Sequence, residues 1–257
     1  RLNRDALAAL HLEKLNRLLA NVSLENAFYR HKLAGVPPRL ESLDQLVTLP
    51  QTTKEELQPP PGSEPFAANR TFGVERYVRC HQTSGTRGQY VLDAAEITER
   101  DRALLAFSFG PFVGFWSAFD ALTARGALVL PGGGLTSLAR LEIIRHAGVT
   151  ALFCTPTYAL RLAEVAAEHT INLAESPVEK IVVAGEPGGS VPATRERIEA
   201  VWNARVIDHS GATEVGPWGF ADAAGRGLHV NEAEFIAEFL SVETGRPAEE
   251  GEVADLI

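Results

Sequence analysis

Three glycine-rich stretches hold residue types that could bind a phosphate or a metal ion, and the first is "TSGTRG" at residues 83–88. Glycine permits backbone angles that other residues avoid, so the amides of such a loop can point inward as a nest for an anion. Serine and threonine hydroxyls add further donors. However, no lysine follows Gly88 as in a P-loop, and turns of small residues are common. Taken alone, this loop indicates a phosphate site only weakly.

The other two stretches are "VAGEPGGS" at 183–190 and "DHSGATEVGPWG" at 208–219. The glycines of 183–190 would let a planar ligand approach the backbone, although a strand-to-helix turn explains them equally well. In 208–219, Glu214 lies in a loop bounded by glycines, where a carboxylate could bind Mg²⁺ beside a phosphate. Strand-end capping explains any one polar residue here, but several polar residues at one edge of a sheet favour a binding site.

Two other stretches contain residues that could take part in catalysis or in ligand binding. Asp208 and His209 are adjacent and suggest a Ser-His-Asp triad, but the chain has no GxSxG motif, and neighbours on a strand point to opposite faces. The triad is therefore disfavoured. The stretch "FSFGPFVGFW" at 107–116 is dense in aromatic residues. Core packing is the ordinary explanation for it, and the wall of a pocket for an aromatic acid is the functional alternative.

Amphipathic helices and buried strands are the predicted elements that must position these loops. Apolar residues recur on one face over 2–22, a second short helix is expected over 24–35, and "QPPPGSEP" at 58–65 is typical of an extended connector. Later helices are expected at 137–147, 155–169 and 190–202, with Ser137 and Thr155 as N-caps, Pro156 at a first helical position and Gly148 at a helix end. Strands are expected within 74–80, 124–134, 149–154, 179–187 and 204–211.

Alternation of strands and helices predicts an α/β fold with a mostly parallel sheet covered by helices. In such sheets ligands bind beyond the carboxyl ends of the strands. This rule selects the loops 83–88, 131–136, 154–157, 185–190 and 209–217. The alternating pattern of 227–257 predicts an antiparallel hairpin or a small β-subdomain. We therefore predict a helical region with its connector at 1–73, an α/β core at 74–220, and a β-subdomain at 221–257.

The composition excludes several classes of protein. The 257 residues are 45% hydrophobic and carry a net charge of −9, which disfavours a binder of nucleic acid or of membrane surfaces because both need basic patches. Cys80 and Cys154 could pair, but two cysteines make no disulfide framework, and a structural zinc motif is missing. A signal-peptide core and an apolar run long enough for a membrane span are missing as well. We expect a cytoplasmic protein with free thiols.

In order along the chain, "TSGTRGQ", "AGEP" and "SGATE" resemble the TSGTTGKP, GGEP and YGxTE motifs of the adenylate-forming enzymes. The stretches "FYRHKL", "LPQTTKEEL", "CTPTYALRLAE" and "GLHVNEAEFIAE" resemble the phenylacetate–CoA ligase branch of that superfamily. The similarity covers nearly the whole chain and keeps the order of the motifs. It implies the large N-terminal domain of an enzyme that activates a carboxylic acid with ATP and Mg²⁺ and passes the acyl group to coenzyme A.

The resemblance also implies roles for individual residues. Residues around the ATP phosphates would be Thr83, Ser84, Gly85, Thr86, Arg87 and Gly88. Residues around the adenine and the rest of AMP would be Gly185, Glu186, Pro187, Asp208, His209 and Ser210. Thr213 would contact the α-phosphate, and Glu214 would hold Mg²⁺. The acyl group would be surrounded by Phe109, Phe112, Phe115, Trp116, Gly211 and Pro217.

The sequence departs from the family pattern at several points. Gln89 stands where the first motif usually has lysine, although Arg87 could supply a charge, and Ser210 replaces the tyrosine that stacks on adenine. The interval from "LDAAE" to "LLAFSFGPF" is shorter than in the family by about one helix. The family's ribose-binding aspartate and its small C-terminal domain with a catalytic lysine are expected beyond residue 257.

Three functions follow as alternatives. The first is an acid–CoA ligase for an aryl or arylacetic acid. The second is an adenylating enzyme that loads a carrier protein, and the third is a non-catalytic module that binds a nucleotide or an acyl group. The family tends toward homodimers, but the sequence itself leaves the oligomeric state open.

Overall fold

The chain divides into two compact units, which are described separately: unit 1 comprises residues 1–80 together with 232–257, and unit 2 comprises residues 81–231. The two units do not test the three domains predicted from the sequence, and those domains stay a prediction. The computed structural model describes residues 2–59, 61–62, 66–77, 89–108, 110, 113–212, 214–222, 224–225 and 227–257, without the side chains of Gln89 and Phe115.

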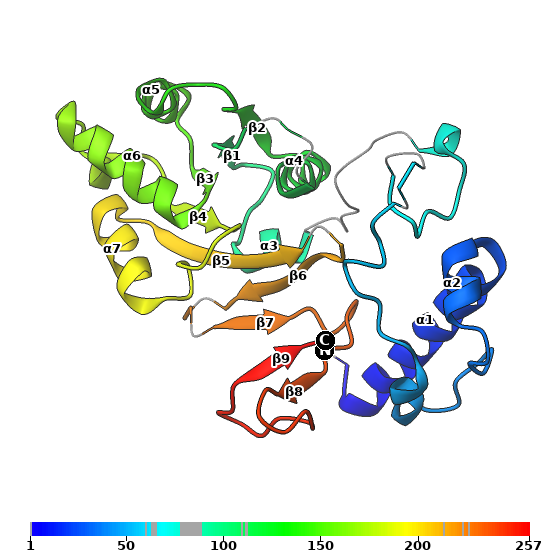
Figure 1. The fold of residues 1–257 in the computed structure, drawn as a ribbon. Helices are drawn as coiled ribbons and strands as arrows, with labels where there is room; N and C mark the ends of the chain where they lie inside the picture. Colours follow the sequence, from blue (N-terminus) through cyan, green and yellow to red (C-terminus); the bar gives the residue numbers. More distant parts are fainter. Residues whose placement is uncertain are drawn as a thin grey trace. The chain divides into compact units, whose positions relative to one another are not determined.

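A seven-stranded sheet forms the centre of unit 2, in the order β2-β1-β3-β4-β5-β6-β7 (Figure 1). The first five strands of that order are parallel, and β6 and β7 are antiparallel to their neighbours. The strands are β1 (Arg102–Leu105), β2 (Leu128–Pro131), β3 (Ala151–Cys154), β4 (Lys180–Val183), β5 (Arg205–Ala212), β6 (Gly216–Ala221) and β7 (Leu228–Val230). The predicted α/β fold with a mostly parallel sheet is confirmed.

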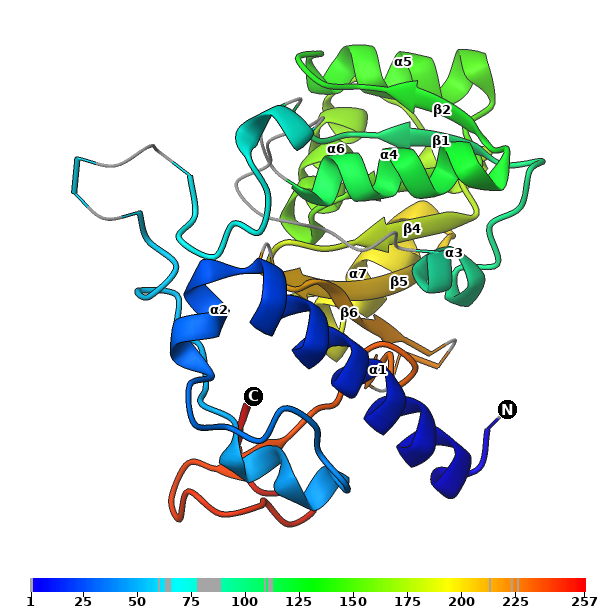
Figure 2. The same cartoon turned by 90° about the vertical axis from the view of Figure 1, so that its right-hand side faces the viewer.

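Helices cover both faces of this sheet. The helices of unit 2 are α3 (Gln89–Ala94), α4 (Val113–Arg125), α5 (Ser137–Ala147), α6 (Pro156–Glu168), α7 (Pro192–Trp202) and the short 3₁₀ helix η3 (Leu173–Glu175). Apolar residues of α5, α6 and α7 pack with one face of the strands, and those of α3 and α4 pack with the other. Figure 2 shows α3 and α4 on the face of the sheet that is turned toward the viewer.

Successive side chains along each strand point alternately into these two cores, with the period of two that an extended chain dictates. Leu104 and Leu152 belong to the core under α5, α6 and α7. Their neighbours Leu105 and Phe153 belong to the core under α3 and α4. Because both faces are buried, the central strands read as continuous apolar runs, which is why the sequence predicts β3, β4 and β5 correctly.

Local capping signals place α5 and α6. The hydroxyl of Thr155 accepts a hydrogen bond from the amide of Tyr158, and Pro156 occupies the first turn of α6, as predicted. Helix α5 ends at Gly148, whose φ of +62° suits glycine. The predicted N-cap of α5 is wrong by one residue: Thr136 caps the helix by accepting from the amide of Ala139, and Ser137 is the first helical residue.

Two further predictions are corrected. Within the predicted strand 74–80, Val74–Arg76 forms a 3₁₀ helix, η2, and residues 78–80 lie outside the described part of the chain. The predicted loop 209–217 is mostly extended, because β5 continues to Ala212 and pairs with β6. Strand β1, "RALL", was not predicted.

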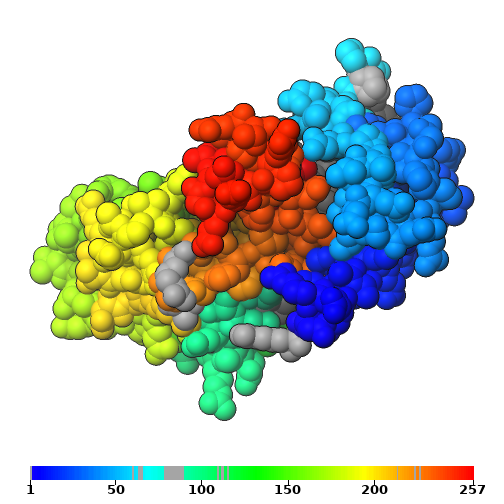
Figure 3. Space-filling model, turned by 90° about the horizontal axis from the view of Figure 1, so that it is seen from below, coloured from blue at the N-terminus to red at the C-terminus, as the bar shows by residue number. Residues whose placement is uncertain are grey.

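Unit 1 contains the predicted N-terminal helices. Its elements are α1 (Arg4–Glu25), α2 (Ala27–Lys32), η1 (Leu43–Thr48), η2, β8 (Phe239–Ser241) and β9 (Ala254–Leu256). Strands β8 and β9 pair in an antiparallel manner, which confirms the predicted hairpin there. Lys14 on α1 donates 2.8 Å hydrogen bonds to the carbonyl of Ala233 and to the carboxylate of Glu234. The two ends of the chain thus join in one unit, seen in blue to cyan and in red in Figure 3.

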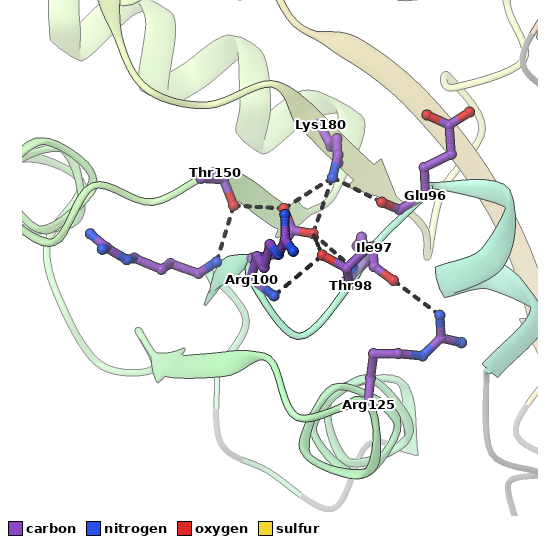
Figure 4. A network of polar contacts seen from close by, with 9 residues as sticks. Glu96, Ile97, Thr98, Arg100, Arg125, Thr150 and Lys180 are labelled. Carbon is purple, nitrogen blue, oxygen red and sulfur yellow. Dashed lines mark hydrogen bonds and ion pairs between the residues drawn. The ribbon is translucent and has the colours of Figure 1, made fainter.

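A polar network stabilises the amino-terminal edge of the unit 2 sheet (Figure 4). Asp101, which precedes β1, accepts hydrogen bonds from the Thr98 amide at 2.8 Å, from the Thr150 hydroxyl at 2.8 Å and from Lys180 Nζ at 3.0 and 3.1 Å. Its side chain is 7% exposed and that of Lys180 15%. Burial alone would raise the pKa of Asp101, but these hydrogen bonds and the lysine charge outweigh burial and lower the pKa. Among the described residues, no helix is long and apolar enough to cross a membrane.

Candidate functional site

The predicted ligand-binding edge is assembled from the loops that follow β4 and β5. These strands are parallel neighbours, and their register pairs the last residue of β4, Val183, with Asp208. The loop 184–190 therefore leaves the sheet beside Asp208, where β5 continues to Ala212 and pairs with β6. The structure thus brings together two of the three glycine-rich stretches at the carboxyl edge, where doubly wound sheets bind ligands.

A carboxylate–threonine contact anchors the loop after β4. One oxygen of Glu186, Oε1, accepts hydrogen bonds from the Thr157 amide at 2.7 Å and from the Thr157 hydroxyl at 2.5 Å. The Thr157 hydroxyl lowers the pKa of Glu186 most, and the amide lowers it further. The carboxylate is therefore ionised at neutral pH and lies at the positive N-terminal end of α6.

Close backbone approach explains two of the glycines in this loop. A Cβ at Gly188 would lie 2.7 Å from Cβ of Pro156, and Gly188 has a φ of +154°. A Cβ at Gly189 would lie 2.5 Å from Cγ2 of Val183 and 2.6 Å from Cγ of Asp208. Both positions therefore exclude a side chain for steric reasons, and the loop lies directly against β4, β5 and the start of α6.

Strands β5 and β6 form a hairpin that carries the third stretch. Asp208 is buried, and its Oδ1 accepts a hydrogen bond from the His209 amide at 2.9 Å. Burial lowers the pKa of His209, although the carbonyls of Gly219 and Ser210 partly offset this effect, so the ring is neutral at pH 7. Ser210 pairs with Gly219, and the register shifts between Ser210 and Gly211. Glu214 lies in the turn between the strands, and Thr213 lies outside the described residues.

The predicted acyl-binding residues are only partly described. Trp116, on α4, donates from Nε1 to the Gly110 carbonyl at 3.0 Å and packs against the core under α3 and α4. Gly211 and Pro217 face each other across the β5–β6 hairpin. Phe109 and Phe112, and the side chain of Phe115, lie outside the described part of the chain. The acyl pocket therefore stays a prediction.

The phosphate loop also stays a prediction. Its six members lie outside the described residues: Thr83, Ser84, Gly85, Thr86, Arg87 and Gly88. Helix α3, which follows at Gln89, packs against the sheet face opposite α5, α6 and α7. Among the described residues, no three His, Cys, Asp or Glu side chains are grouped so that they could hold a metal ion. The magnesium role of Glu214 therefore stays a prediction.

Sequence reasoning missed two side chains at this edge. Thr157 was quoted only as part of a motif, and its contact with Glu186 depends on a separation of 29 residues. Arg140, on α5, is 7% exposed, donates from Nε to the Gly132 carbonyl at 2.9 Å, and lies 4.9 Å from the ring centre of Tyr158. No local signal distinguishes this buried arginine from the exposed charges of an amphipathic helix.

Comparisons with known proteins agree with this geometry. A family model described as "AMP-binding enzyme" matches residues 79–253, a range that includes all three glycine-rich stretches. The chain belongs to the AMP-binding enzyme family.

Curated relatives of this AMP-binding chain confirm the resemblance to the phenylacetate–CoA ligase branch. The phenylacetate–coenzyme A ligase of Thermus thermophilus is 28% identical over 281 residues, which cover 100% of this chain and 62% of that protein. The enzyme of the same name from Escherichia coli is also 28% identical, over 98% of this chain and 62% of that protein. The chain thus spans about three fifths of the length of these relatives.

Among solved structures, an open conformation of 2-hydroxyisobutyryl-CoA ligase in complex with 2-HIB-AMP and CoA superimposes with a TM-score of 0.86. The match covers 100% of this chain and 66% of that one at 22% identity. The same ligase in the postadenylation state, in complex with 2-HIB-AMP, gives a TM-score of 0.84 over 98% of this chain. At this level of identity the likeness shows a shared fold.

Proposed function

We propose that the whole protein is an acid–thiol ligase that activates a carboxylic acid with ATP and transfers the acyl group to coenzyme A. The observation that carries this proposal is the register of β4 and β5, which sets the "AGEP" loop beside Asp208 and the "SGATE" hairpin at the ligand-binding edge. Membership of the AMP-binding family and the relatives named phenylacetate–coenzyme A ligase support it.

The proposed reaction has two steps. In the first, a carboxylate oxygen of the acid attacks the α-phosphorus of ATP, and the bond to the β-phosphate oxygen breaks, which yields an acyl-adenylate and pyrophosphate. In the second, the sulfur of coenzyme A attacks the acyl carbon, AMP leaves with the bonding electron pair, and the thiol proton is released. The protein's main contribution is to hold two anions together and to offset their repulsion.

In this proposal the residues divide into groups by the part of the substrates that they contact. The backbone of 185–187 would line the adenine, with Asp208 near its amino group. The loop 83–88 would hold the β- and γ-phosphates, and Thr213 the α-phosphate. Glu214 would bind Mg²⁺, which neutralises phosphate charge when it is bound. His209 is neutral and half-buried, so it would support the hairpin and add no charge to the phosphates.

The proposed acid is an aryl or arylacetic acid. Aromatic residues are concentrated at 107–116, and Trp116 packs near the carboxyl end of β1 with the partly buried Phe107. The names of the relatives point to the same class. A cytoplasmic location and a homodimer are part of the proposal and rest on the composition and on the family resemblance.

The test is ATP–pyrophosphate exchange by the whole protein with a panel of benzoates, phenylacetates and aliphatic acids, with acid-free and Mg²⁺-free reactions as controls. The proposal expects exchange that depends on an aromatic acid. Measurable nucleotide binding without exchange for any acid would refute the ligase function. If exchange occurs, hydroxylamine trapping followed by acceptor assays separates coenzyme A from a carrier protein.

A non-catalytic module that binds a nucleotide or an acyl group is the second candidate. Gln89 and Ser210 favour it, because they replace the lysine and the tyrosine of the family motifs. Under this alternative, AMP would bind to the protein, and exchange would remain absent even when saturating acid, ATP and Mg²⁺ are supplied.

A further inference from the structure

We propose that Glu186 and Thr157 form a positioning clamp that fixes the nucleotide-binding loop, and that the Glu186 carboxylate acts through the loop and makes no direct contact with the nucleotide. The inference rests on the proposed function and assigns a separate role to the side chain of Glu186, whose backbone is the part of the motif proposed to line the adenine. It follows from three structural observations at the loop 184–190.

The first observation is the direction of the Glu186 side chain. Its Oε1 atom accepts two hydrogen bonds from one residue, Thr157, at 2.7 Å and 2.5 Å. Thr157 is the second residue of α6. The carboxylate therefore accepts a hydrogen bond from one of the amides that a helix leaves unpaired at its N-terminus. The acceptor is charged, and charge-assisted hydrogen bonds of this kind are stronger than neutral ones.

The second observation is the surface that the loop leaves for a ligand. Gly185 and Pro187 are exposed on either side of Glu186, whereas Gly188 and Gly189 are buried against Pro156, Val183 and Asp208. With the carboxylate turned toward α6, the accessible part of the loop consists of backbone and the flat proline ring. A planar, uncharged base packs more favourably on such a surface than beside a free carboxylate.

The third observation is that the clamp adds polar contacts between a glycine-rich loop and the start of α6. Gly185 has a φ of +92° and Gly188 a φ of +154°, so the loop has a flexible residue on each side of Glu186. A Cβ at Gly188 would fall 2.7 Å from Pro156, which shows how closely the loop lies on α6, but glycine provides no polar contact there. Among the described residues, Glu186 makes the side-chain hydrogen bonds that tie 184–190 to α6.

The decisive experiment compares AMP and pyrophosphate as separate ligands of the purified whole protein by titration calorimetry. Glu186→Ala is expected to weaken AMP binding by about tenfold, in line with the loss of a hydrogen bond to a charged group. Pyrophosphate binding is expected to stay unchanged, because it has no adenine. Hydrogen exchange at the amides of 184–190 is expected to accelerate in the variant, with other segments unaffected.

Conservative variants separate positioning from folding. Glu186→Gln keeps an acceptor oxygen but loses the charge, so it should weaken AMP binding less than Glu186→Ala does. Thr157→Ser keeps the hydroxyl and should bind AMP nearly as well as the wild type. Thr157→Val removes the hydroxyl alone and should weaken AMP binding less than Glu186→Ala. Glu196→Ala, an exposed glutamate on α7, serves as the matched control for removal of a surface charge.

The outcomes distinguish this inference from the proposed function. Wild-type protein that binds neither ATP nor AMP would overturn the proposed function and the clamp together. Tight AMP binding by the wild type with equal binding by Glu186→Ala and by Thr157→Val would overturn the clamp alone. Equal loss of AMP and pyrophosphate binding in these variants would also overturn it, because it would indicate a general defect of folding.

Discussion

Gly189 lies so close to Asp208 that a Cβ built on the glycine would fall 2.6 Å from the carboxyl carbon of the aspartate. The two residues come from neighbouring parts of the sheet edge, since Asp208 pairs in register with Val183 at the end of β4. This approach joins the loop after β4 to the middle of β5, so it fixes the position of one predicted ligand-binding stretch relative to another.

Gly189→Ala is therefore expected to destabilise the protein by about 2 kcal/mol, the usual cost of an added carbon in a packed site. Its Cβ would also lie 2.5 Å from Cγ2 of Val183, so the loop must move outward. Urea unfolding provides the measurement. Gly114→Ala is the matched control, because a Cβ on that helical glycine meets no atom within 4 Å, and it should be neutral or slightly stabilising.

Asp101→Asn is expected to lower the free energy of unfolding by about 3 kcal/mol, since it leaves the largely buried ammonium of Lys180 without its carboxylate. The reverse change, Lys180→Met, should cost less if the apolar stem packs well, because a buried ion pair contributes modestly against an apolar replacement. Chemical denaturation at pH 7 measures both. Equal stability of Asp101→Asn and wild type would contradict the structural role of the network.

The same network predicts a dependence of stability on acid. The folded protein holds the pKa of Asp101 below its usual value, so the unfolded chain binds the proton first as the pH falls. The stability from this group is complete above about pH 4 and is lost as the pH falls through the folded pKa. Denaturation midpoints between pH 2 and pH 5 should therefore fall more steeply for the wild type than for Asp101→Asn.

His209 predicts a second pH dependence, at higher pH. Burial lowers the pKa of His209 in the folded protein, so the unfolded chain takes up the proton first, from about pH 6.5 downward. Stability is complete above that pH and declines as the pH falls toward the folded pKa. A thermal-unfolding series from pH 5 to pH 8 should show a flatter profile for His209→Gln, and an identical profile would refute the assignment.

Glu214→Gln tests the proposed metal role. Replacing the carboxylate removes one anionic ligand and about 2 kcal/mol of charge-assisted interaction, which corresponds to about a 30-fold loss in ATP–pyrophosphate exchange. Raised Mg²⁺ should restore part of the rate. Undiminished exchange at low Mg²⁺ would exclude Glu214 as a metal ligand.

Arg87→Ala tests how the first loop compensates for Gln89. If Arg87 supplies the charge that the family's lysine provides, its removal should lower exchange by about tenfold, the range expected for one charge-assisted contact. Adding Gln89→Lys to that variant should restore activity. Full exchange by Arg87→Ala alone would mean that the loop binds phosphate without this side chain.

Much of the fold follows from local signals that the sequence contains. Thr155 and Pro156 start α6, Gly148 ends α5, and the apolar runs around Phe153 and Val183 form buried strands, because capping and apolar burial depend on a few neighbouring residues. The same signals, with the rule that ligands bind at the carboxyl edge, bring "AGEP" and "SGATE" to one edge of the sheet, although Ser210–Ala212 lies in β5 and not in the expected loop. The order of these motifs is enough to indicate the family.

The tertiary structure decided the contacts between residues that are far apart in the chain. Strand β1 lies between β2 and β3, Asp101 meets Lys180 across 79 residues, and Glu186 meets Thr157 across 29. The direction of the Glu186 carboxylate and the steric need for Gly189 depend on strand order and register. These properties arise from packing of distant segments against one another, and the spacing of residues along a single strand or helix does not encode them.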